Sequence, residues 1–253
     1  MSLDYLAALT ELSRQQFLIV AAACFCAGVV RGFSGFGLSA LVMAALASMI
    51  APVELIPVCY ILEGVAGVMM FRGGVRDADM SVVWVLVMGS AIGVPLGLLA
   101  TVTVPVEVSK MIALGVVLCL TLAQLLKVNA RFLDTKPGRY ITGLVAGVVT
   151  GLASVGGLVI ALYVLASKTE PRTIRGTLAM FLFGSMFTSI VYLYAYDVMN
   201  LLAAKRGLVF TPLVVVGVLI GTWFFRPSLQ GLYKRFCLLL LVSLALMGLV
   251  RMI

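Results

Sequence analysis

Long apolar stretches alternate with short charged segments along the chain. The stretches with few or no charged residues are 15–50, 53–71, 80–105, 111–126, 140–167, 176–196, 207–225 and 236–250. A helix that crosses the hydrocarbon layer of a membrane needs about 20 apolar residues. Most of these stretches therefore predict one membrane-spanning helix each, and residues 3–14 predict a short amphipathic helix that lies on the membrane surface.

Glycine-rich sequences interrupt two of these stretches. RGFSGFG occupies residues 31–37, and TGLASVGG occupies residues 150–157. Glycine weakens a helix by about 1 kcal/mol relative to alanine, so several glycines together predict that the helix stops. Non-helical backbone at membrane depth persists only where it is buried in protein or lines a cavity. Each sequence therefore predicts two helical arms that meet near the middle of the membrane.

The two interrupted stretches are copies of one another. Residues 27–52 fall on residues 146–171 after a shift of 119, with ten of the 26 aligned positions identical. The identical pairs include Gly28/Gly147, Gly32/Gly151, Gly37/Gly156 and Pro52/Pro171. This duplication predicts a first repeat over residues 1–126, which includes the surface helix, a polar linker over 127–139, and a second repeat over 140–253.

The distribution of basic residues favours two repeats of opposite orientation. Cytoplasmic loops of membrane proteins carry an excess of lysine and arginine. If each interruption is a hairpin, the halves are inverted and the two sides carry 12 and 5 basic residues, with Arg31 at the hairpin tip. If each interruption is one bent span, the halves are parallel and the split is 10 to 7.

We therefore predict an all-α polytopic membrane protein with two inverted repeats, each a Gly-broken helical hairpin followed by three transmembrane helices. Both termini are expected outside and the 127–139 linker in the cytoplasm. Whether the broken segments are re-entrant hairpins or pairs of short full spans stays open at this point.

Composition excludes several classes of protein. Of the 253 residues, 63% are hydrophobic and 11% charged, with a mean hydropathy of +1.19. A soluble domain has about 45–50% apolar and about 25% charged residues, so a soluble enzyme, a nucleic-acid reader and a disordered protein are excluded. The net charge of +8 is assigned to cytoplasmic loops. The chain has no histidine, which excludes a metal site built on histidine. We also expect no other metal site, no cofactor and no nucleic-acid partner. The lipid bilayer is the expected surrounding, and a homodimer stays open.

The two interruptions predict an anion site. The second arm of each hairpin begins at the break, so its N-terminus offers unpaired N–H groups and about half a positive charge. Such an end binds anions, and glycine lets a ligand approach the backbone closely. The candidate residues are Gly32, Ser34, Gly35, Gly37, Gly151, Ser154, Gly156 and Gly157. The alternative is that the glycines only permit close helix packing.

Three charged residues are further candidates. Arg31 either attracts the anion or extends to the membrane surface, and its copy is Thr150, which makes any site asymmetric. Glu63 lies ten residues after Val53, about 15 Å along a helix, near the middle of the membrane. It is a candidate for proton coupling, with a static partner of Arg31 or a neutral hydrogen-bonded carboxyl as alternatives. Arg175 either draws anions into an inner vestibule or anchors its helix.

The quoted motifs resemble those of a known family. AGVVRGFSGFG, its copy AGVVTGLASVGG, and the runs ALYVLASKTEP and RTIRGTLAMFLF are similar to the TauE/SafE sulfite exporter family over nearly the whole chain. Family members often carry proline shortly after the glycine motif, where this chain has Leu38 and Leu158. The resemblance implies a secondary transporter in a bacterial inner membrane that exports a small sulfur-containing anion, sulfite or an organosulfonate, without catalysis.

Two other functions stay open from the sequence. A passive anion channel has the same sequence features as a transporter. A membrane thiol or disulfide electron carrier would use Cys24, Cys26, Cys59, Cys119 and Cys237, but none of them forms a CxxC pair. Cys24 and Cys26 are two residues apart and do not face one another on a helix, so small apolar side chains in a core are the favoured interpretation of the cysteines.

Overall fold

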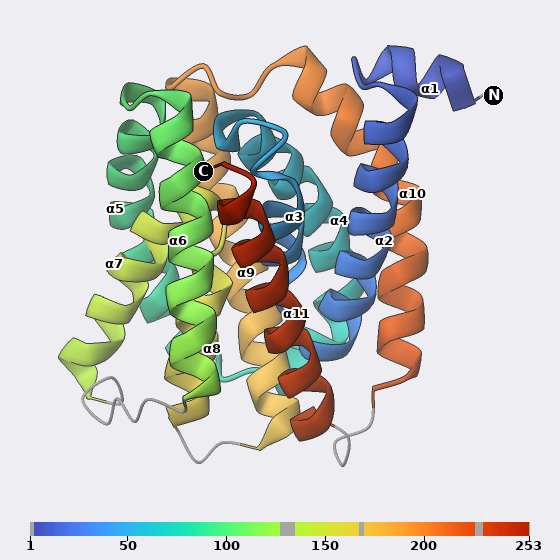
Figure 1. Cartoon of the computed structure of the whole chain (residues 1–253). Helices are drawn as coiled ribbons and strands as arrows, with labels where there is room; N and C mark the ends of the chain where they lie inside the picture. Colours follow the sequence, from blue (N-terminus) through green and yellow to red (C-terminus); the bar gives the residue numbers. More distant parts are fainter. Residues whose placement is uncertain (1–2, 127–134, 167–169, 226–229, 253) are drawn as a thin grey trace.

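The computed structural model describes residues 3–126, 135–166, 170–225 and 230–252, and the regular structure of these residues is α-helical. The helices are α1 (Leu3–Leu9), α2 (Arg14–Ser34), α3 (Leu38–Leu46), α4 (Pro52–Asp77), α5 (Met80–Thr103), α6 (Val106–Leu125), α7 (Lys136–Ala153), α8 (Gly156–Ala166), α9 (Pro171–Ala195), α10 (Leu201–Trp223) and α11 (Gln230–Val250) (Figure 1). Among the described helices, α2, α4, α5, α6, α9 and α10 are long and apolar enough to cross a membrane.

Large apolar side chains cover the outside of the bundle. Trp84, Ile92, Val191 and Leu219 are all more than half exposed. A water-soluble protein rarely exposes so much contiguous apolar surface, whereas lipid tails accommodate it. Together with the six long helices, this surface makes the chain a multi-pass membrane protein.

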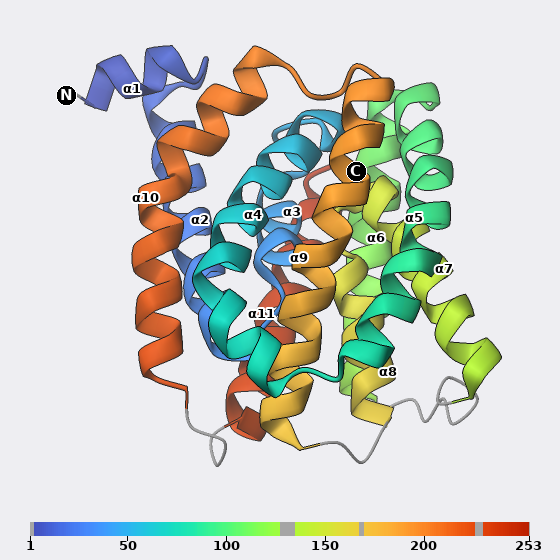
Figure 2. The ribbon, with the colours of Figure 1, turned by 180° about the vertical axis from the view of Figure 1, so that it is seen from behind.

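The chain path places both ends of the protein toward one end of the bundle (Figures 1 and 2). Helix α2 starts at this end and runs to the opposite end, and α3 turns back beside it. Helix α7, the copy of α2, starts at the opposite end and runs back, and α8 reverses its direction (Figure 1). Each glycine-rich sequence thus joins two antiparallel arms.

Polar capping side chains set where several helices begin. Ser13 and Gln16 form a capping box at the start of α2, and the carboxylate of Asp79 accepts the N–H groups of Ser81 and Val82 at the start of α5. Such caps satisfy N–H groups that the helix itself leaves unpaired. Thr135 caps α7, which starts at Lys136, so the last four residues of the predicted linker are helical. Residues 127–134 of that linker lie outside the described residues.

Close glycine contacts join the two halves of the chain crosswise. A Cβ atom added to Gly93 of α5 would lie 2.1 Å from the carbonyl oxygen of Leu144 in α7, and one added to Gly221 of α10 would lie 2.1 Å from that of Val29 in α2. Only glycine permits backbones to come this close. The first arm of each hairpin is therefore packed against a helix of the other half.

Two predicted site residues belong to these contacts. A Cβ atom on Gly32 would lie 2.3 Å from the carbonyl oxygen of Val218, and one on Gly151 would lie 2.4 Å from that of Val94. The structure therefore places Gly32 and Gly151 at helix crossings, as the packing alternative predicts.

Candidate functional site

The first hairpin turns through two glycines in the left-handed conformation. Gly35 ends α2 with φ +83°, and Gly37 precedes α3 with φ +93°. Side chains are strained at these angles and glycine is not. Ser34 closes the turn, since its hydroxyl lies 2.7 Å from the carbonyl oxygen of Val30 and 2.6 Å from that of Phe36. The role of Ser34 here is to hold the turn.

The second hairpin makes a similar turn with a different residue. Ser154 ends α7 in the left-handed conformation, with φ +57°, and α8 starts at Gly156. A Cβ atom on Gly156 would lie 2.0 Å from the hydroxyl oxygen of Thr150 and 2.4 Å from the carbonyl oxygen of Ala146. Gly156 is therefore required for α8 to fold back onto α7.

The two turns lie on opposite sides of one small cavity. Gly37 and Ser39 from the first hairpin line it together with Ser154 and Gly157 from the second, and Glu63 completes it. Its volume is about 10 Å³, which is about the space of a single water molecule. The structure is therefore closed around the place where the two hairpins meet.

Glu63 occupies the N-terminal end of α3. Its Oε1 atom accepts hydrogen bonds from the backbone N–H of Ser39, at 3.3 Å, and from the Ser39 hydroxyl, at 3.0 Å. The first N–H groups of a helix lack partners within the helix and carry partial positive charge. A carboxylate of the protein itself therefore fills the anion position that the first break creates.

Arg31 pairs with this carboxylate and is fully buried. Its Nε atom lies 2.8 Å from Oε2 of Glu63, and its side chain is 0% exposed, so Arg31 does not extend to a membrane surface. Its Nη1 group also donates to the carbonyl oxygen of Gly35. The Nη2 group makes no hydrogen bond within the part of the chain that the structure describes, which leaves one buried donor for a ligand.

Arg175 holds the end of α2 from α9. Its Nη2 and Nε groups donate to the carbonyl oxygen of Gly32 at 2.6 and 3.2 Å, and Nη2 also donates to the hydroxyl of Thr222 at 3.2 Å. The last carbonyl groups of a helix carry partial negative charge. Arg175 therefore stabilises the end of the first arm, and it also lines a larger cavity between α4, α9 and the end of α10.

The second hairpin lacks the corresponding charges. A shift of 119 places Thr150 at the position of Arg31 and Leu182 at the position of Glu63. The Thr150 hydroxyl donates to the carbonyl oxygen of Ala146 at 2.6 Å, and Leu182 lines the small cavity opposite Glu63. The N-terminus of α8 therefore faces the cavity with no acidic side chain of its own at the equivalent position.

The structure brings together most of the predicted residues. Around the small cavity and the first break lie Arg31, Ser34, Gly35, Gly37, Glu63, Ser154, Gly156 and Gly157. Sequence reasoning missed Ser39 and Leu182. Both could have been found from the sequence. Ser39 is the second residue of the arm that follows the break, and Leu182 corresponds to Glu63 after the shift of 119.

The described residues hold no group of three or more histidine, cysteine, aspartate or glutamate side chains placed to bind a metal ion. Cys24, Cys59 and Cys237 are buried, whereas Cys26 and Cys119 are exposed on the outside of the bundle.

Spanning helices, with two broken segments that face one another inside the bundle, define a membrane protein of the transporter class. A family model described as Sulfite exporter TauE/SafE matches residues 20–248. The chain belongs to this family, which is a family of transporters. Neither the curated proteins nor the solved structures contain a match.

The buried ion pair yields a stability prediction. Removing one partner leaves the other charged and buried, which costs about 3–5 kcal/mol. We expect Arg31→Met and Glu63→Leu each to lower the free energy of unfolding by about this amount, and the double variant to recover most of the loss. Reversible unfolding in mixed micelles measures these free energies.

The pair Glu107 and Lys110, 3.0 Å apart with the Glu107 side chain 69% exposed, is the matched control. Neutralising either residue should cost less than about 1 kcal/mol. Simple addition of the two losses in the Arg31→Met/Glu63→Leu variant would show that the pair is not coupled.

Proposed function

We propose that this protein is a secondary transporter that exports a small sulfur-containing anion, sulfite or an organosulfonate, across a bacterial inner membrane. The observation that carries the proposal is the meeting of the α3 and α8 N-termini around one cavity beside a buried arginine. Membership of the sulfite exporter family supports the substrate class. A membrane potential that is negative inside favours the exit of an anion by about 2.3 kcal/mol per charge per 100 mV.

The anion binds at the second hairpin in this proposal. Glu63 already occupies the N-terminus of α3. At the start of α8 the N–H of Leu158 donates to the carbonyl oxygen of Val155, and the N–H groups of Gly156 and Gly157 have no partner within the helix. Gly157 lines the cavity, and the Nη2 donor of Arg31, whose side chain pairs with Glu63 at the cavity, makes no hydrogen bond with the described residues. A cavity of about 10 Å³ does not hold sulfite, so the two hairpins separate when the anion enters.

We propose further that the two halves are inverted repeats, with both termini on the periplasmic side. Three observations support this arrangement. Helix α2 and its copy α7 run in opposite directions (Figure 1). Both ends of the chain lie toward one end of the bundle. The hairpin arrangement also gives the clearer bias of basic residues between the two sides.

Cysteine labelling tests this topology. In a variant without native cysteines, Asp134→Cys should react with a membrane-impermeant maleimide only after the cells are permeabilised. Leu201→Cys, at the start of α10 and 72% exposed, should react in intact cells. Labelling of position 134 from outside intact cells would overturn the proposed orientation.

Transport in proteoliposomes tests the function itself. Labelled sulfite should show saturable uptake and counterflow, whereas flux that neither saturates nor shows counterflow would indicate a passive channel.

Gly157→Ala adds a methyl group 3.3 Å from a methyl carbon of Leu182, in front of the α8 N-terminus. Loss of a charge-assisted hydrogen bond costs about 1.5–3 kcal/mol, so we expect sulfite affinity to fall by about one to two decades.

Gly115→Ala is the matched control for this substitution, because a Cβ atom at Gly115 meets no atom within 4 Å. Its sulfite affinity should equal that of the wild type. Wild-type affinity in a well-folded Gly157→Ala variant would contradict a site at α8.

If a proton gradient drives export, Glu63 is the residue that carries the coupled proton in this proposal. An ionised Glu63 faces the cavity and repels an anion there, and protonation removes that repulsion. The alternative driving force is the gradient of the substrate itself.

The ratio of sulfite flux with an imposed pH gradient to flux without one distinguishes the proton gradient from the substrate gradient as the driving force. Glu63→Gln keeps the size of the side chain but cannot exchange a proton, so it should reduce the ratio to one, whereas Glu107→Gln, at an exposed carboxylate, should keep it. An unchanged ratio in Glu63→Gln would remove Glu63 from the coupling.

A further inference from the structure

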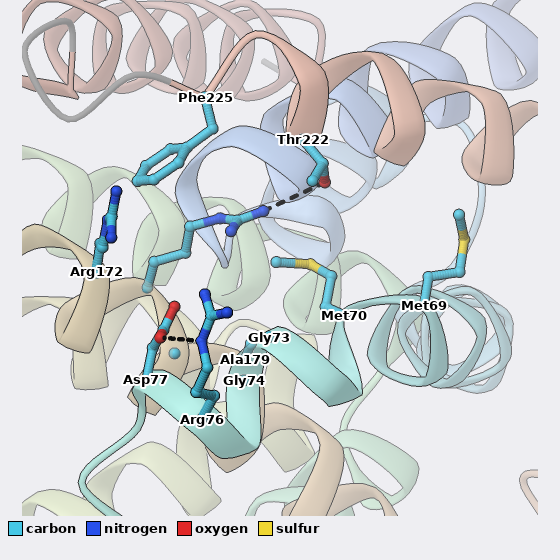
Figure 3. A pocket seen from close by; sticks show the side chains of 12 residues that line it. Met69, Met70, Gly73, Gly74, Arg76, Asp77, Arg172, Ala179, Thr222 and Phe225 are labelled. Atoms are coloured by element: carbon cyan, nitrogen blue, oxygen red, sulfur yellow. Dashed lines mark hydrogen bonds and ion pairs between the residues drawn. The ribbon is translucent and has the colours of Figure 1, made fainter.

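A second and larger cavity lies where α4 ends and α9 begins. Its volume is about 340 Å³, and α4, α9 and the end of α10 supply its walls. It shares no lining residue with the small cavity between the hairpins. Figure 3 shows its side chains arranged around a common space. The size falls within the range of about 300–1,000 Å³ that is usual for pockets that hold organic ligands.

Three arginines give this cavity an excess of positive charge. Arg76 comes from α4, and Arg172 and Arg175 come from α9. The one carboxylate in the lining belongs to Asp77, and it already binds Arg76, with Nε and Oδ1 3.0 Å apart. Two positive charges therefore lack a balancing carboxylate in the lining.

The donors of these arginines are only partly used. Arg175 donates to two uncharged acceptors, the carbonyl oxygen of Gly32 and the hydroxyl of Thr222. Arg172 forms no hydrogen bond or ion pair with the described residues. A guanidinium group in this situation is suited to the planar recognition of an oxyanion.

The opposite wall of the cavity is apolar. Met69 and Met70 lie on the side away from Arg172, whereas Phe225 lies near Arg172 (Figure 3). The ring of Phe225 also contacts Arg175, whose guanidinium carbon is 4.6 Å from the ring centroid. A ligand that contacts both walls needs a charged head and an apolar body. Sulfite has only the head.

We propose that this cavity is a separate binding site for an organic sulfonate with a short alkyl body, held by Arg172 and Arg175 at its head and by Met69 and Met70 along its body. The proposal rests on the proposed function in one respect, because it takes the bound sulfonate to be a transport substrate that binds next to the transport site before it is transported. The link between the two sites is Arg175, which lines the cavity and also holds the end of α2 at Gly32.

Calorimetry on the full-length protein in phosphatidylcholine nanodiscs tests the site. The probes are methanesulfonate, ethanesulfonate, 1-propanesulfonate and 1-butanesulfonate. Each added methylene group that becomes buried should tighten binding about fourfold. Arg172→Gln should weaken 1-butanesulfonate binding about tenfold to a hundredfold and leave the affinity for sulfite, measured by counterflow, unchanged.

Arg72→Gln is the matched control. Arg72 lies on α4 one turn before Arg76, is exposed, and does not line the cavity. Equal weakening by Arg72→Gln and Arg172→Gln would mean that only the general surface charge matters and would overturn the proposal. Affinity independent of chain length would overturn it as well.

Anionic lipid is the other source of an oxyanion at this end of the bundle. The same titration is therefore repeated in nanodiscs that contain phosphatidylglycerol. Unchanged 1-butanesulfonate affinity supports a soluble ligand, whereas its displacement by phosphatidylglycerol, with loss of lipid retention in Arg172→Gln, would assign the cavity to a lipid headgroup and overturn the proposal.

The test also distinguishes this site from the proposed function. Chain-length-dependent binding that is lost in Arg172→Gln, in a protein without sulfite counterflow, would keep the site and reject the function. Normal counterflow together with unchanged 1-butanesulfonate binding in Arg172→Gln would keep the function and reject the site. Unchanged melting temperatures of Arg172→Gln and Arg72→Gln confirm that each variant is folded.

Discussion

The ion pair between Arg31 and Glu63 solves a problem that follows from ending a helix inside a membrane protein. Where α2 stops and α3 starts, carbonyl groups with partial negative charge and N–H groups with partial positive charge lie close together. These groups are buried, and unpaired buried polar groups are costly. Arg31 binds the carbonyl end at Gly35, Glu63 binds the N–H end at Ser39, and the two side chains neutralise each other.

The second break has a similar backbone turn between two helical arms but lacks these charged side chains. Thr150 and Leu182 replace the arginine and the glutamate, and a Thr150 hydrogen bond stays within its own helix. The chain thus repeats the shape of the break and alters its electrostatics. One break is stabilised by protein side chains, and the other has a helix N-terminus at the cavity without such side chains. A single anion fits this division better than two equivalent anions would.

Much of this architecture could be predicted from the sequence, because it depends on local features. Apolar length predicted the spanning helices, and glycine clusters predicted both breaks. The partnership of Arg31 with Glu63 was one of several alternatives, since the sequence does not say which helices meet. The assignment of Gly32 and Gly151 to helix crossings likewise depends on contacts with Val218 and Val94 in the other half of the chain. The sequence offered an inner vestibule at Arg175 as one alternative but did not place Arg76 in it, because Arg76 and Arg172 are far apart in sequence and meet only where α4 and α9 pack together.

The end of α2 contacts residues at both cavities. On one side, the Arg175 side chain donates to the carbonyl oxygen of Gly32. The backbone of Arg175 also lies close to Gly35, because a Cβ atom added to Gly35 would lie 2.7 Å from the carbonyl oxygen of Arg175. On the other side, Arg31 donates to Gly35 and pairs with Glu63 at the small cavity. A change in what Arg175 binds therefore alters the hydrogen bonding of the same helix end that positions Arg31. Because both arginines carry a positive charge, an anion bound beside Arg175 also weakens the repulsion between them. The end of α2 is therefore the element that connects the two proposed sites.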